Sequence, residues 1–187
     1  MHMPAAMPNK TGREVTLFIA MSLDGYIADE DGNIDWLQAF EEQEGTTNSY
    51  DMFIKNIDSI IMGYTTYHQL ITEITPNQWP YDKQYTYVIT HRALKDKSNI
   101  CFMNQDLVSL LHDLKQKEGK GIWVCGGAQI ITPLIEQRMI DVYHISVIPV
   151  LLGNGIRLFQ KQKSFQSLEL IRTVSYNGIT DLIYKTK

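Results

Sequence analysis

Apolar runs alternate with helix-like patterns along most of the chain, and this order predicts alternating strands and helices. The run at 15–21 is almost continuously apolar, which is typical of a central strand covered on both faces. The predicted strands cover residues 15–21, 57–62, 85–90, 100–102, 122–125, 141–148, 168–176 and 179–185. The predicted helices run from 47 or 48 to about 56, and over 65–71, 106–117 and 128–136.

Polar residues mark several of the expected boundaries. Thr47 or Asn48 is expected to cap the first helix, and Asn104 or Gln105 to open the third. The pair Asn177-Gly178 separates the last two strands and is a strong signal for a tight hairpin.

The order of elements predicts an α/β fold: a three-layer sandwich with a mostly parallel central sheet and a C-terminal antiparallel hairpin. The 187 residues suit a single domain over 14–187, preceded by a flexible tail at 1–13. Residues 26–45 are polar and predicted to be irregular.

Composition excludes several classes of protein. The net charge of −4 and the lack of a basic stripe argue against a nucleic-acid partner. No apolar run approaches the roughly 20 residues that span a bilayer, and no signal peptide begins the chain, so a cytoplasmic protein is expected. Cys101 and Cys125 are expected to be buried free thiols. The five scattered histidines predict no metal site.

Two places in the chain join a strand to a helix through glycine. One covers 124–130 and contains Gly126-Gly127, and the other covers 60–66 and contains Gly63. Glycine lets backbone N–H groups approach a ligand closely, and a helix N-terminus attracts phosphate. Two such junctions can hold a dinucleotide, which indicates a nicotinamide-dependent reductase. Simple helix capping is the alternative explanation of both junctions.

Taken in order, these junctions resemble the dihydrofolate reductase-like superfamily. The resemblance is greatest to the C-terminal reductase domain of bifunctional riboflavin-biosynthesis deaminase-reductases. The motifs that carry it lie at 20–28, 61–63, 88–92, 124–128 and 148–155.

The resemblance implies a dihydrofolate reductase-like fold, NADPH as the cofactor and a small-molecule substrate. The residues expected near the pyrophosphate are Gly63, Thr65, Thr66, Gly126, Gly127, Ala128, Gln129 and Ile130. Ala20 and Ile27 are expected near the nicotinamide, and Trp36 resembles the tryptophan of a mobile loop over the substrate pocket. In dihydrofolate reductases the Gly-Gly bond is cis, and the sequence alone does not determine its state here.

Arg92 follows the strand expected to end near the adenosine ribose. Its guanidinium is a candidate partner for the 2′-phosphate, with Thr90 or His91 adding a hydrogen bond. A solvated loop arginine is the alternative. Many dihydrofolate reductases carry a basic residue just after the first glycine, where this chain has Tyr64, so the expected phosphate contact shifts to Arg92.

The source of the substrate proton is left open between Asp24, Asp51 and an ordered water, with Asp35 as a weaker candidate. Asp24 either lines the pocket or caps its own turn. The carboxylate of the first helix in dihydrofolate reductases falls near Ser49, so Asp51 is a nearby candidate that is otherwise a surface residue. Phe53 is either an apolar wall of the substrate pocket or part of the core.

The expected reaction is hydride transfer to a small cyclic or conjugated substrate. A 5-amino-6-ribosylamino-pyrimidinone or a pterin fits this description, and the missing helix carboxylate argues against folate. A non-catalytic NADPH-binding sensor or assembly module is the alternative. The apolar loop at 149–155 must be covered by its own sheet or by a second copy, and a homodimer is expected.

Overall fold

The computed structural model describes residues 12–40, 49–161 and 164–187, and its centre is one eight-stranded sheet. The strands of this sheet are β1 (Val15–Ser22), β3 (Ile57–Gly63), β4 (Tyr85–Ile89), β5 (Ile100–Met103), β6 (Gly121–Gly126), β7 (Val142–Ile148), β9 (Leu168–Tyr176) and β10 (Ile179–Thr186). A second, two-stranded sheet pairs β2 (Tyr26–Ala28) with β8 (Ile156–Arg157).

Short helices connect the strands. They are α1 (Ser49–Ile54), α2 (Tyr64–Gln69), α3 (Leu107–Gln116), α4 (Ala128–Glu136), the 3₁₀ helix η1 (Asp35–Phe40) and the π-helical turn η2 (Leu70–Ile74). Asp106 caps α3, since its carboxylate accepts a hydrogen bond from the backbone N–H of Ser109 at 2.8 Å. The expectation that Asn104 or Gln105 opens this helix is therefore wrong by one or two residues.

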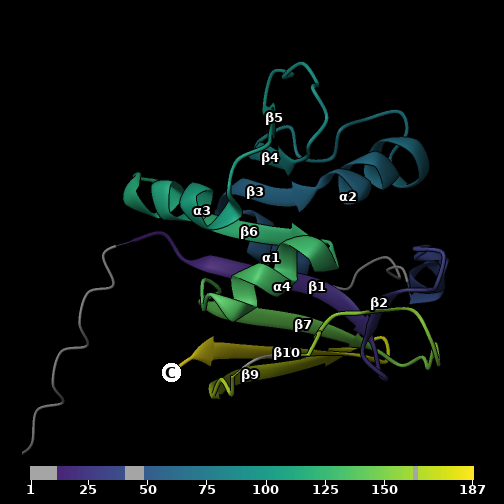
Figure 1. Cartoon of the computed structure of the whole chain (residues 1–187). Helices are drawn as coiled ribbons and strands as arrows, with labels where there is room; N and C mark the ends of the chain where they lie inside the picture. Colours follow the sequence, from purple (N-terminus) through teal and green to yellow (C-terminus); the bar gives the residue numbers. More distant parts are fainter. Residues whose placement is uncertain (1–11, 41–48, 162–163) are drawn as a thin grey trace, which may run out of the picture.

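The strand order across the large sheet is β5-β4-β3-β6-β1-β7-β10-β9. Pairs from β5 to β7 are parallel, and β10 pairs antiparallel with both β7 and β9. Helices α3 and α4 cover one face of the sheet and α1 covers the other, which gives the three layers (Figure 1). The parallel strands all end at one edge of the sheet, where α2, β2 and the segment after β7 gather (Figure 1).

Each face of the sheet has its own apolar core. Alternation along β1 sends Leu17 toward α3 and α4, and Phe18 toward α1. Leu111 and Leu134 complete the first core, while Trp123 packs beside Phe18 in the second. Burial on both faces explains why β1 is a nearly continuous apolar run.

The structure confirms the predicted order of strands and helices and the C-terminal hairpin. Asn177 and Gly178 have φ values of 46° and 81°, as a tight turn with two left-handed residues requires. The short strand β2 and the helix η1 lie in the segment predicted to be irregular, so that prediction is wrong for nine residues of it. Both cysteines are free, but each is only half-buried.

Two predictions fall outside the described residues. The expected caps Thr47 and Asn48 belong to residues 41–48, and most of the expected tail belongs to residues 1–11. The division into a tail at 1–13 and one domain at 14–187 stays a prediction.

Gly155 lets the backbone of the segment after β7 pass close to the end of β2. Its φ is 142°, and a Cβ at this position would lie 2.2 Å from the carbonyl oxygen of Ala28. Gly153 has a φ of 76°, yet a Cβ there would meet no described atom within 4 Å. Alanine at these two positions would therefore separate the cost of a left-handed backbone, which both share, from the cost of a steric clash with Ala28, which only position 155 has.

We expect Gly155→Ala to lower the free energy of unfolding by at least about 3 kcal/mol, because backbone must move to admit the methyl group. Gly153→Ala is the matched control and should cost about 1 kcal/mol, the penalty of a left-handed alanine alone. Urea denaturation of both variants measures the difference. Equal losses would show that the Ala28 contact is not a constraint on this loop.

Candidate functional site

The two glycine junctions lie side by side at the edge where the parallel strands end. Met62 of β3 pairs with Gly126 of β6, so Gly63 and Gly127 follow from neighbouring positions. A Cβ built on Gly63 would lie 3.9 Å from the backbone nitrogen of Gly127 and 3.3 Å from Cγ1 of Ile130. Only glycine leaves this space between the two strand ends open.

Thr66 closes the space from the side of α2. Its Oγ1 would lie 3.6 Å from a Cβ on Gly127 and 3.9 Å from a Cβ on Gly126. The peptide bond between these two glycines is cis, the state that the sequence left undetermined. The structure thus brings Gly63, Thr66, Gly126 and Gly127 together at the ends of two neighbouring strands.

Both helices that begin here start at glycine. Gly63 is the N-cap of α2 and Gly127 is the N-cap of α4, and neither helix has a side-chain cap among the described residues. The first N–H groups of a helix have no partner one turn earlier, so they can bind an anion. In α4 the N–H of Ile130 already donates to the Gly127 carbonyl at 2.9 Å, which leaves those of Ala128 and Gln129 for this role. Thr65 stands in the first turn of α2, and Ala128 and Gln129 stand in that of α4.

A guanidinium lies beside the start of α2. Arg92 places its Cζ 4.4 Å from the centre of the Tyr64 ring, in a cation–π contact. Its backbone N–H also donates to Oγ1 of buried Thr90 at 3.1 Å, and His91 between them is exposed. Tyr64 occupies the position where the sequence analysis expects a phosphate contact to be missing, and in the structure its ring packs against Arg92, which follows the next strand.

The residues expected around the nicotinamide and the substrate are more dispersed. Ala20 is half-buried in β1 on the α1 face, whereas Ile27 packs with the core under α3 and α4. Trp36 is half-buried in η1, and its Nε1 is enclosed without a hydrogen-bond partner among the described residues. Phe53 packs edge-on against Phe18 at 4.8 Å between ring centres, within the aromatic core.

Asp24 makes the contacts of a turn cap. Its carboxylate accepts a hydrogen bond from Ser22 Oγ at 2.7 Å and from the backbone N–H groups of Leu152 and Gly153 at 3.1 and 2.7 Å. The Ser22 bond, supported by the two N–H groups, holds the pKa of Asp24 below its ordinary value. A general acid needs the opposite shift. The geometry therefore favours the capping alternative for this residue.

Helix α1 turns its two polar residues in nearly opposite directions. Ser49 is buried and faces the sheet, and Asp51 lies two positions, or about 200°, further around the helix, where it is exposed. Asp51 consequently lies on the side of α1 that faces away from the sheet. The position identified from the sequence as that of a helix carboxylate is thus a serine that reaches the sheet.

Ser49 reaches a buried carboxylate that the sequence analysis missed. Asp181 of β10 is fully buried and accepts hydrogen bonds from Ser49, His144, Ser146 and Tyr176. Polar residues at buried positions of two apolar strands were the available signal. Nothing in the local pattern showed that these strands are neighbours.

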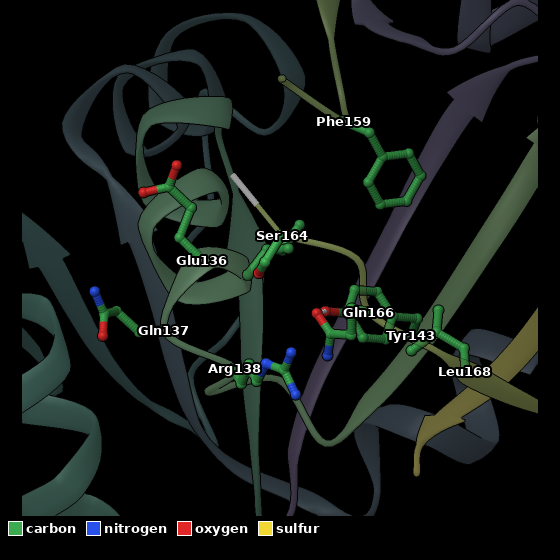
Figure 2. A pocket seen from close by; sticks show the side chains of 9 residues that line it. Glu136, Gln137, Arg138, Tyr143, Phe159, Ser164, Gln166 and Leu168 are labelled. Carbon is green, nitrogen blue, oxygen red and sulfur yellow. Dashed lines mark hydrogen bonds between the residues drawn. The ribbon is translucent and has the colours of Figure 1, made fainter. Parts of the chain in front are cut away.

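A separate cavity of about 330 Å³ lies at the far end of α4, lined by Arg138, Tyr143, Phe159 and Gln166 among others (Figure 2). It borders the last turn of α4, whereas the glycine junction is at the first turn. The two sites are therefore at opposite ends of this helix.

The described residues include no helix that is long and apolar enough to cross a membrane. They also contain no group of three or more His, Cys, Asp or Glu side chains arranged to hold a metal ion.

Comparison with known proteins agrees with this geometry. The family model of the RibD C-terminal domain matches residues 13–184. The uncharacterized protein YwjB of Bacillus subtilis (strain 168) is 38% identical over 174 residues, covering 92% of this chain and 97% of YwjB. A solved structure from Shewanella sp. PV-4, assigned to riboflavin biosynthesis, is 26% identical with a TM-score of 0.81, covering 93% of this chain and 99% of that one.

Two more distant structures share the fold. A diaminohydroxyphosphoribosylaminopyrimidine deaminase/5-amino-6-(5-phosphoribosylamino)uracil reductase from Thermotoga maritima is 14% identical, with a TM-score of 0.68 over 95% of this chain and 58% of its own. Dihydrofolate reductase from Enterococcus faecalis, complexed with NADP(H) and RAB-propyl, is 15% identical, with a TM-score of 0.62 over 92% of this chain and 96% of its own. Together with the sheet order, they confirm the predicted dihydrofolate reductase-like fold class.

The contacts of Asp24 predict a pH-dependent contribution to stability. Because folding lowers its pKa, Asp24 stabilises the fold above the ordinary aspartate pKa of about 3.9, and this contribution is lost as the pH falls through the folded-state value. Asp24→Asn should therefore lower Tm at neutral pH. The difference from the unchanged chain should shrink toward about pH 3.

Asp31→Asn is the control, because no hydrogen bond to the Asp31 carboxylate is found among the described residues. Thermal unfolding at a series of pH values measures both variants. A Tm difference for Asp24→Asn that is the same at all pH values would contradict the capping role.

Proposed function

Because the chain belongs to the RibD C-terminal domain family, we propose that it is an NADPH-dependent reductase of a small heterocyclic substrate. The family and the Shewanella structure support a reductase-type function. The observation that carries the finer proposal is the pair of glycine strand ends with 3.9 Å between a Cβ on Gly63 and the nitrogen of Gly127. Any other residue at these positions would obstruct the approach of a dinucleotide to the backbone.

The proposed pyrophosphate site uses both helix starts. Gly63, Thr65 and Thr66 hold it from the side of α2, and residues 126–130 hold it from the side of α4. The absence of side-chain caps at both starts, within the described chain, leaves N–H groups for phosphate oxygens. The Enterococcus dihydrofolate reductase, which has the same fold, is complexed with NADP(H).

Arg92 is the proposed ligand of the 2′-phosphate that distinguishes NADPH from NADH. The Tyr64 ring orients the guanidinium from one side, and the Thr90 hydroxyl fixes the backbone of Arg92. A planar guanidinium held in place pairs strongly with phosphate. His91 is exposed beside it and is a second proposed contact.

At the other end of the cofactor, Ala20 and Ile27 are the proposed contacts of the nicotinamide. Bound NADPH would supply the hydride, while the chain orients it and excludes water. Trp36 is proposed to border the substrate, and its Nε1 has no hydrogen-bond partner within the described part of the chain. Phe53 is proposed as the apolar wall under the substrate ring.

The proposed substrate is a pyrimidinone or pterin-like ring rather than folate. The Thermotoga protein is a 5-amino-6-(5-phosphoribosylamino)uracil reductase, and its fold is shared by this chain. In addition, the residue of α1 that faces the sheet is Ser49, at the position where dihydrofolate reductases carry the carboxylate that binds the pterin ring. The uracil derivative is the first acceptor to test.

A non-catalytic NADPH-binding sensor or assembly module is the second candidate. The low pKa of Asp24 and the exposed position of Asp51 favour it, because neither residue is then placed as the proton donor. Catalytic roles for these two aspartates stay predictions. Oxidation of NADPH by the uracil derivative would distinguish the enzyme from the sensor.

Arg92→Gln should weaken NADPH binding by about ten- to a hundredfold and leave NADH binding unchanged, because only NADPH carries the 2′-phosphate. Quenching of tryptophan fluorescence measures both affinities in the unchanged chain and the variant. Arg172→Gln, on exposed β9, is the matched control and should change neither affinity.

Two results would contradict the proposal. A chain that binds neither nucleotide lacks the cofactor site altogether. A chain in which Arg92→Gln weakens NADPH and NADH equally has its 2′-phosphate partner elsewhere.

We also propose that the protein forms a homodimer through the end of β1 and the loop at 149–155. Leu23 is 63% exposed and Leu151 is 73% exposed, and a backbone hydrogen bond of 2.9 Å from Leu23 to Val150 holds the two segments together. Asp24 fastens the same loop through Leu152 and Gly153. A rigid loop that presents large apolar side chains is suited to packing against a second copy.

Light scattering after size exclusion should give a mass near twice the 21.5 kDa of one chain. Leu151→Glu should shift the protein toward the monomer, because a charge would be buried at the contact. Leu94→Glu changes a leucine that is 40% exposed elsewhere and should leave the mass unchanged. A monomeric unchanged chain, or a dimer insensitive to Leu151→Glu, would contradict this arrangement.

A further inference from the structure

A buried polar cluster centred on Asp181 lies against the start of helix α1. His144 Nε2 lies 3.1 Å from Oδ2 of Asp181, and Ser146 Oγ donates to Oδ1 at 2.6 Å. Ser49 donates to Oδ2, and the hydroxyl of Tyr176 donates to Oδ1 at 3.3 Å. Four side chains from α1, β7 and β9 thus converge on one carboxylate of β10.

The carboxylate is saturated in its ionised form. Burial alone would raise the pKa of Asp181, but hydrogen bonds from His144, Ser146 and Ser49 outweigh it and lower the pKa. An ionised carboxylate can only accept, so the hydrogen shared with His144 must be on Nε2. With all its lone pairs engaged, Asp181 has no capacity left for a ligand and acts through His144.

Within the described part of the chain, the other ring nitrogen of His144, Nδ1, has no hydrogen-bond partner. It is also absent from the enclosed unpartnered atoms of the described chain, which are Trp36 Nε1, Trp79 Nε1 and Thr86 Oγ1. The side chain is 8% exposed, so an oriented imidazole keeps one nitrogen for another partner.

Strand register places this imidazole beside the proposed nicotinamide position. Ala20 of β1 pairs with Ser146 of β7, and Ser146 pairs with Asp181 of β10, so the three form one row on the α1 face. His144 pairs with Phe18, two residues before Ala20 on the same face. Neighbouring strands are about 4.8 Å apart, and alternate residues of one strand are about 7 Å apart. The backbone positions of His144 and Ala20 are therefore close enough for one heterocyclic ring to contact both residues.

The surroundings of His144 suit a flat substrate. Its ring centre lies 4.0 Å from that of Phe18, at an interplanar angle of 34°, and 6.4 Å from that of Phe53. Phe53 is the proposed apolar wall of the substrate pocket. The proposed wall and the imidazole are therefore neighbours under α1.

We propose that His144 is a catalytic residue that delivers the substrate proton through Nδ1, and that Asp181 is its positioning residue. This inference rests on the proposed reductase function. Bound NADPH would supply a hydride to the electrophilic carbon of a C=N or C=O group and would itself be oxidised to NADP⁺. His144 acts in its imidazolium form, with one hydrogen on Nε2 toward Asp181 and a second on Nδ1. The π electrons of the reduced group move to its heteroatom, which takes the Nδ1 proton and leaves the neutral Nε2–H imidazole. A proton from solvent then restores the imidazolium, while Asp181 stays ionised throughout.

The kinetic test follows NADPH oxidation with 5-amino-6-(5-phosphoribosylamino)uracil as the acceptor. His144→Gln should lower kcat by about 10²- to 10⁴-fold, the usual contribution of general acid catalysis, with NADPH affinity within about twofold. Asp181→Asn should lower kcat by about ten- to a hundredfold, because the imidazole loses its orienting partner. His112→Gln, on α3, is the matched control and should leave kcat unchanged.

Chemical rescue separates proton delivery from a structural role. Free imidazole should restore part of the rate lost in His144→Ala and none of that lost in Asp181→Asn. If His144→Gln or His144→Ala binds NADPH normally and keeps its full kcat, the inference is overturned. If the unchanged chain binds no NADPH, the proposed function itself fails, which is a different outcome.

A spectroscopic test needs no turnover. Nitrogen NMR of the imidazoles should show His144 of the unchanged chain with its hydrogen on Nε2, and a mixture of tautomers in Asp181→Asn. A hydrogen found on Nδ1 in the neutral ring would overturn the inference, because the bond to Asp181 would then not orient the residue. A folded Ser146→Ala variant should keep the Nε2 tautomer, since the His144 bond remains.

Discussion

The parallel pairing of β3 with β6 is the constraint on which the proposed site depends. Parallel strands end at the same edge of a sheet, so their connections to α2 and α4 begin side by side. Glycine at both ends then leaves backbone N–H groups open in place of side chains. Hydrogen bonding between β3 and β6 thereby brings the two glycine junctions together as one proposed phosphate-binding site.

The same edge combines rigid and adaptable parts. Asp24 fastens the segment after β7 to the end of β1, and Gly155 fastens it to β2, so this side is fixed by backbone contacts. Arg92, in contrast, is oriented by a ring face, and its guanidinium has no hydrogen-bond partner among the residues that the structure describes. A fixed scaffold with a few engaged but unsaturated polar groups is the usual form of a small-molecule site.

The cluster around Asp181 is best explained by the orientation that it gives to His144, and not by a gain in the free energy of folding. An ionised carboxylate in an apolar layer is costly unless donors surround it, and an apolar residue at the same place would avoid that cost. Four donors make the charge tolerable, and one of them, His144, is held in a single orientation. The fold thus orients an imidazole near the strand ends, where the reduction is proposed to occur.

The sequence by itself determined the strands of the large sheet, the approximate ranges of α1 to α4, the final hairpin and the glycine junctions, because periodicity, capping and turn preference act over a few residues. The contact of Arg92 with Tyr64 and the short elements β2, β8 and η1 depend on contacts beyond that range. Only the tertiary structure placed Asp181 beside His144, 37 residues earlier in the chain. Strand register decides which side chains meet across a sheet, and register is set by the packing of the whole molecule.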